Sequence, residues 1–151
     1  MKKLLFYIID RLLGTTLFNP DATLITAVMD QNKRQVKRLI RNGADLEVSN
    51  QKETTPLILA AKTDQFRIAE ILLNAGANPF AVSMFGWTLG YAAQTSCLIR
   101  GPEFKALQRV TAKIQECGYP MPGPDKPEIE KMVEHGNWPP KEWDIRKFYG
   151  K

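Results

Sequence analysis

The apolar and polar positions in the middle of the chain recur at an interval of 33 residues. "TTPLILAA" occupies residues 54–61, and "WTLGYAAQ" occupies residues 87–94. In the same way, "RNGAD" at 41–45 is followed by "NAGAN" at 74–78. A fixed period of this length is typical of stacked supersecondary units.

The middle unit predicts two short helices. Thr55 is a good N-cap, and Pro56 suits the first helical position, where a missing N–H removes no hydrogen bond. Residues 57–61 then form the first helix. Residues 66–76, "FRIAEILLNAG", place apolar residues at three- and four-residue spacing and form the second helix. Gly76 supplies the left-handed residue that ends it.

These features resemble the ankyrin repeat family, in which two helices are followed by a projecting β-turn. "TPLILAA" and "ILLNAGANP" carry the resemblance, although Ile58 replaces the histidine usual in the family. The resemblance covers three units over residues 22–118. The third unit starts with "GWTLGYAA" but reaches its last glycine nine residues late, and we expect the extra residues at "CLIRGPE". Another α-solenoid of helix pairs would not explain the "GAD" and "GAN" turns.

The resemblance implies an all-α fold, a short ankyrin-type helical repeat stack with capping helices at both ends. We expect one domain over residues 1–151. Residues 1–21 form the N-terminal capping helix, with a signal or membrane anchor as the alternative for its apolar start. Residues 119–151 hold a Pro-rich connector, a capping helix and a tail. The tail aromatics either pack or contact a partner: Trp138, Trp143, Phe148 and Tyr149.

Charge adds one candidate surface. The net charge is +5, and 44% of the 151 residues are hydrophobic, which is an ordinary globular balance. Five cations fall within nine residues, and they form either a solvated helix face or a docking patch for an acidic partner: Lys33, Arg34, Lys37, Arg38 and Arg41.

The sequence contains no recognisable catalytic set, so we expect no enzyme and no cofactor. Cys97 and Cys117 have no metal-ligand spacing, and His135 is the only histidine. A nucleophile needs a base and a group that orients the base, and no such arrangement is evident. Two cysteines without a disulfide framework favour a reducing compartment, so we expect a cytoplasmic protein.

The resemblance also implies a binding surface made of β-turn tips and the late positions of the first helices. The first tip supplies Gln51, Lys52 and Thr54, and the second supplies Met84, Phe85 and Trp87. The helix positions are Met29, Asp30, Lys62, Thr63, Thr95 and Ser96. We expect Trp87, Met84 and Phe85 to form an apolar centre with Lys52 and Lys62 at its rim. The alternative is that "SMFGW" packs inside the atypical third unit.

The resulting functional hypothesis is a non-enzymatic ankyrin-repeat protein that binds another protein. It would neutralise a cognate toxin or effector enzyme by occlusion, as an immunity protein or antitoxin does, or act as an adaptor. The alternative is a basic module that binds nucleic acid or an anionic membrane. The absence of a helix-turn-helix signature and of interleaved aromatic and basic residues weighs against this alternative.

Overall fold

The computed structural model describes residues 20–143, and these residues form helices and connecting turns with no β-strand among them. The helices are α2 (Pro20–Met29), α3 (Lys33–Arg41), α4 (Pro56–Lys62), α5 (Phe66–Asn74), α6 (Leu89–Thr95), α7 (Gly101–Glu116) and α8 (Lys126–Glu134). The predicted all-α repeat stack is therefore confirmed for this part of the chain. The N-terminal capping helix predicted in residues 1–21 lies outside the described residues, except for Pro20 and Asp21, which belong to α2.

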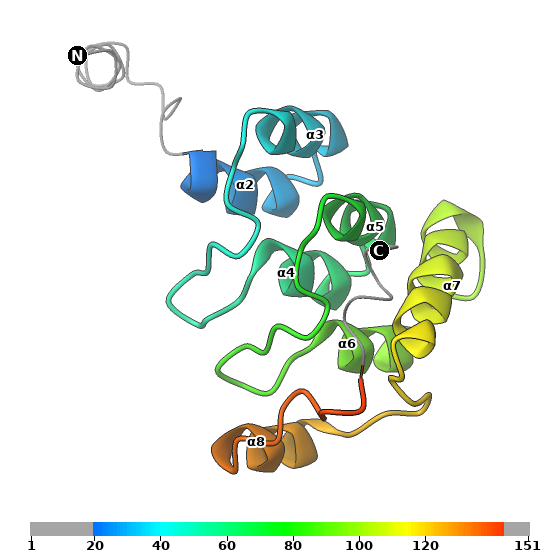
Figure 1. The fold of residues 1–151 in the computed structure, drawn as a ribbon. Helices are drawn as coiled ribbons and strands as arrows, with labels where there is room; N and C mark the ends of the chain where they lie inside the picture. The colour runs from blue at the N-terminus through cyan, green and yellow to red at the C-terminus, as the bar shows by residue number, and fades with distance from the viewer. Residues whose placement is uncertain (1–19, 144–151) are drawn as a thin grey trace.

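The helices α2 to α7 form two layers (Figure 1). In the inner layer α4 contacts both α2 and α6, and in the outer layer α5 contacts both α3 and α7. The connections from α3 to α4 and from α5 to α6 project to the same side as two long turns. None of the helices in the described part of the chain combines the length and apolarity needed to cross a bilayer.

The helix starts follow the predicted capping. The Ile58 N–H donates to Thr55 Oγ1 at 3.4 Å, and the Tyr91 N–H donates to Thr88 Oγ1 at 3.0 Å. Both threonines have extended backbone, as N-cap residues normally do. The inner helices α4 and α6 therefore begin with the same local hydrogen bond, 33 residues apart.

The backbone also carries the 33-residue period. Positive φ values occur at three pairs of equivalent positions: Gln31 and Asp64, Gly43 and Gly76, and Glu53 and Gly86. These positions follow the inner helices, follow the outer helices and lie at the turn tips, respectively. The left-handed region reverses the chain sharply, so the same reversals are repeated in successive units.

The third unit differs from the prediction in how it accommodates its extra length. The connection between α6 and α7 spans residues 96–100, only slightly longer than residues 63–65 between α4 and α5. Most of the additional residues instead lengthen α7, which has 16 residues against 9 in α5. The longer helix is tied to α5 by Arg109, whose Nε and Nη2 lie 2.6 and 2.8 Å from the two carboxylate oxygens of Glu70.

Tyr119 closes the inner layer where the repeat pattern is broken. Leu24 and Leu57 are fully buried at equivalent positions, but the next equivalent position is Gly90. The ring of Tyr119, 3% exposed, occupies this space, because a Cβ on Gly90 or on Gly123 would overlap it. Burial raises the pKa of Tyr119 to about 12.

The described part of the tail packs against this closure. Trp143 lies 4.9 Å from the Tyr119 ring and 5.4 Å from the Phe80 ring, measured between centroids. The Trp138 indole N–H donates to the Phe80 carbonyl oxygen at 2.7 Å. Packing of Trp138 and Trp143 is therefore the correct alternative for this part of the tail, whereas Phe148 and Tyr149 lie outside the described residues.

We predict that Gly90→Ala destabilises the protein by about 1–3 kcal/mol, because the added methyl group overpacks the site filled by Tyr119. This loss should occur although alanine favours helix formation by about 1 kcal/mol over glycine. Urea unfolding followed by circular dichroism measures the change. Gln115→Ala, at an exposed position of α7, is the control and should be nearly neutral. An unchanged midpoint for Gly90→Ala would contradict this packing.

Candidate protein-binding surface

The fold places the predicted contact residues in two groups. The first group lies at the tips of the two projecting turns, and the second lies at the C-terminal ends of the inner helices α2, α4 and α6. A backbone hydrogen bond joins the tips, from the Met84 N–H to the Lys52 carbonyl oxygen at 3.1 Å. The tips are therefore fixed relative to each other.

The second tip exposes two large apolar side chains. Met84 is 52% exposed and Phe85 is 50% exposed. The tip itself is closed by backbone hydrogen bonds from Ser83 to Trp87 and from Gly86 to Ser83, both at 3.0 Å. An ordered turn therefore presents Met84 and Phe85 to solvent together.

Trp87 is placed differently from Met84 and Phe85. Its ring is half-buried and packs against the core, edge-on to the Tyr91 ring at 5.2 Å. The ammonium groups of Lys62 and Lys126 each lie 4.9 Å from its centroid. These cation–π contacts bring Lys62 and Trp87 together, and they occupy the ring with intramolecular partners.

The first tip is polar. Gln51 and Lys52 are exposed, and Thr54 is half-buried. The Asn50 side-chain oxygen accepts from the N–H groups of Lys52 and Thr54 at 2.9 and 3.2 Å. Glu53 completes this tip with a left-handed backbone, at φ 53°.

The predicted contact residues at the ends of the inner helices differ in whether their side chains already form intramolecular hydrogen bonds. Met29, 66% exposed, and Asp30 face solvent at the end of α2. The hydroxyls of Thr63 and Thr95 each donate at 2.8 Å to the carbonyl oxygen four residues earlier. The Ser96 hydroxyl donates to Asp64 Oδ1 at 2.7 Å. These three hydroxyls therefore already contribute to the ends of the inner helices.

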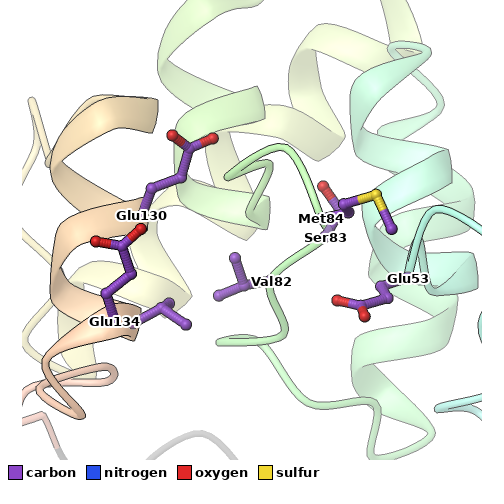
Figure 2. A pocket seen from close by; sticks show the side chains of 7 residues that line it. Glu53, Val82, Ser83, Met84, Glu130 and Glu134 are labelled. Atoms are coloured by element: carbon purple, nitrogen blue, oxygen red, sulfur yellow. The ribbon is translucent and has the colours of Figure 1, made fainter.

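A groove between the second tip and α8 was missed by the sequence reasoning. Figure 2 shows the groove, which has a volume of about 410 Å³ and is lined by Glu53, Val82, Ser83, Met84, Glu130, Val133 and Glu134. The available signal was the four-residue spacing of Glu130 and Glu134, which places both on one face of a helix. Their position beside the tip depends on the connector that precedes α8.

The predicted basic cluster lies in the outer layer. Lys33, Arg34 and Lys37 of α3 line a second groove of about 350 Å³. Arg67, Glu70, Ile71 and Arg109 complete its lining. The Arg109 guanidinium hydrogen-bonds Glu70 and holds the pKa of that carboxyl below its usual value. The outer-helix groove is therefore mainly cationic and stands apart from the tips.

The described residues contain no cluster of three or more His, Cys, Asp or Glu side chains suited to a metal. Cys117 is buried at the end of α7, whereas Cys97 is exposed. His135 is exposed at the end of α8, with its Nδ1 2.6 Å from the Lys131 carbonyl oxygen. The buried thiol and the helix-end histidine match the structural roles expected for such residues.

We predict that Trp87→Ala destabilises the protein by about 2 kcal/mol, because it removes a large, partly buried ring and the contacts of two lysines. The neighbouring Phe85→Ala should change the free energy of unfolding by less than about 0.5 kcal/mol, since that ring is half exposed. Urea unfolding of both variants measures the difference. Equal midpoints would show that Trp87 does not support the third unit.

Comparison with known proteins agrees with this architecture. A family model for ankyrin repeats, in three copies, matches residues 6–99. The match begins earlier than the predicted boundary at residue 22 and ends before α7. The matched region therefore includes part of the predicted N-terminal cap at residues 1–21.

Curated relatives share the repeats over part of their length. An ankyrin repeat protein of Acanthamoeba polyphaga mimivirus is 39% identical over 61 residues, covering 40% of this chain and 38% of the relative. The human mitochondrial disaggregase is 36% identical over 61 residues, covering 40% and 9%. The human B-cell lymphoma 3 protein is 35% identical over 86 residues, covering 54% and 18%.

The chain thus spans less than two fifths of the length of each of these relatives. Ankyrin repeats are a protein–protein interaction module, and the family is typically non-enzymatic. Stacked helix pairs, paired turn tips and a family match over more than half of the residues agree: the chain belongs to the ankyrin repeat family.

Proposed function

We propose that this protein binds another protein through the two turn tips and the adjoining ends of the inner helices. The observation that carries the proposal is the pair Met84 and Phe85, both about half exposed on a hydrogen-bonded tip. Exposed aromatic and methionine side chains are typical of interface centres. Gln51 and Lys52 of the first tip, and Met29 and Asp30 at the end of α2, supply further polar and apolar contacts.

Binding at these tips would act by occlusion. The tips are tied by the hydrogen bond from Met84 to Lys52, so little conformational freedom is lost when a partner docks. A rigid surface of this kind suits the neutralisation of a cognate toxin or effector enzyme, in the manner of an immunity protein or antitoxin. An adaptor would use the same surface but leave the partner active.

We predict that a photo-crosslinking benzoylphenylalanine in place of Phe85 captures the partner in cells of the source organism. The same group in place of Gln108, exposed on the outer helix α7, is the control and should capture nothing. Phe85→Asp should weaken binding by about 30-fold, as expected for loss of an apolar anchor. Capture at Gln108 but not at Phe85 would overturn the proposed surface.

Neutralisation is tested separately by co-expression with the product of the neighbouring gene. If that product inhibits growth, wild-type protein should restore growth, and Phe85→Asp should fail to do so. A captured partner that keeps its full activity in the complex would instead identify an adaptor.

The outer-helix basic groove favours a second candidate, an interaction with nucleic acid or an anionic membrane. Lys33, Arg34, Lys37 and Arg67 gather cations from two helices there. Electrostatic contacts of this kind weaken steeply as salt rises. Glu70 is the single carboxylate among the described residues that line the groove, and it is already paired with Arg109.

We predict that replacement of Lys33, Lys37 and Arg41 with serine slows association with an acidic protein partner, mainly at low salt. Stopped-flow association rates measure this effect. Unchanged association rates at low ionic strength would show that the basic cluster of α3 is a solvated helix face and not a docking patch. Gel shifts with random duplex DNA and flotation with anionic vesicles test the other ligands, and salt-sensitive binding to either one would favour the second candidate.

A further inference from the structure

The groove between the second tip and α8 combines an apolar lining with acidic walls. Val82, Met84 and Val133 provide the apolar surface, of which Met84 is 52% and Val133 46% exposed. Glu53 comes from the first tip, and Glu130 and Glu134 come from α8 (Figure 2). Three segments that are distant in sequence therefore build one site.

The apolar residues of the groove are separated from the core. They lie at a turn tip and on an outward-facing part of α8, whose one buried residue is Ile129. Large apolar side chains gathered in one hollow, and rimmed by polar residues, are typical of a site that another molecule covers. Phe85, half exposed, follows Met84 in sequence and is a second exposed apolar side chain on the same tip.

The charge of the groove is opposite to that of the whole protein. The chain carries a net charge of +5, yet among the described residues no lysine or arginine lines the groove. Within residues 20–143, none of the carboxylates of Glu53, Glu130 and Glu134 forms an ion pair. Lys126, at the start of α8, lies over the Trp87 and Tyr91 rings. These carboxylates therefore remain to pair with cations from outside.

The groove is held in shape before any ligand arrives. The Met84 N–H binds the Lys52 carbonyl oxygen, which fixes the second tip against the first. Gly86 lets α8 approach the tip closely, because a Cβ there would stand 2.9 Å from the Lys126 carbonyl oxygen. The Asp125 side chain accepts from the Glu128 N–H at 2.9 Å and caps α8. A preformed site loses little entropy on binding.

We propose that this groove binds a segment of a protein partner in which an apolar side chain is flanked by lysine or arginine. The apolar side chain contacts Val82, Met84 and Val133, and the cations pair with the glutamates on either wall. Carboxylates repel phosphate groups, so the same site disfavours nucleic acid. The inference rests on the proposed function, because it assigns one class of segment to a partner that approaches the tips.

Binding of a labelled nonapeptide of alternating arginine and leucine tests the proposal by fluorescence anisotropy, with the whole protein at low salt. We expect saturable binding, and no binding of the same peptide with glutamate in place of arginine. The double variant Glu130→Gln, Glu134→Gln should weaken binding by about tenfold. Val133→Ser should weaken it at high salt as well as at low salt, because it removes apolar contact.

The matched control is the double variant Glu116→Gln, Glu128→Gln, which has the same net charge but alters residues outside the groove. It should change the dissociation constant by less than about twofold. All four glutamates are exposed, and melting curves of both variants check that each is folded. Equal weakening by the two double variants would overturn the proposal, because it would show attraction to overall charge.

Two other outcomes would also overturn it. If neither peptide binds, the groove is not a site for basic segments. Crosslinking at Phe85 would still test the proposed function independently, because it does not depend on the groove. If sedimentation at low salt shows self-association that depends on Glu130 and Glu134, the occupant is a second copy of this chain, whose α3 is basic.

Discussion

The arrangement of the molecule depends on backbone reversals that few residues tolerate. The first two units turn sharply after the inner helix, after the outer helix and at the tip, and equivalent residues adopt positive φ at each of these places. These turns set the helices of a pair beside each other and direct the connections to one side (Figure 1). Glycine occupies the reversal after the outer helices, where Gly43 and Gly76 have φ values of 80° and 105°. The reversals therefore place the tips, and the tips carry the candidate surface.

The C-terminal end of the stack shows how a repeat array stops. Another inner helix would normally cover α6, but here Tyr119 fills the space above Gly90, and Trp143 packs against Tyr119. The connector then brings α8 against Gly86 at the second tip. Because α8 closes the stack beside a tip, it also supplies one wall of the acidic groove. The same C-terminal segment therefore closes the core and forms one wall of the groove.

Charge is divided between the two surfaces of the protein. In the outer-helix groove, cations gather around Glu70, which is paired with Arg109, whereas the tip groove gathers carboxylates around apolar side chains. Long-range attraction to an acidic surface and local capture of a basic segment would therefore act at different places on the molecule. Trp87 lies on the same tip as Met84 and Phe85, but its ring is covered by Lys62 and Lys126, whereas Met84 and Phe85 are exposed.

The repeat, the helix caps and the turns were predictable because they depend on residues close together in sequence. Thr55 caps its own helix, Gly76 ends its own helix, and the 33-residue period makes each prediction hold in the next unit. The sequence also identified Met84 and Phe85 as unusual at a turn tip.

Tertiary structure alone decided which side chains meet across the end of the stack. The absence of a side chain at Gly90 has meaning only when Tyr119, 29 residues later, enters the space. The groove likewise joins Glu53 to Glu134 across a long stretch of chain. Such contacts depend on the path of an irregular Pro/Gly connector, which has no periodic pattern from which that path could be predicted.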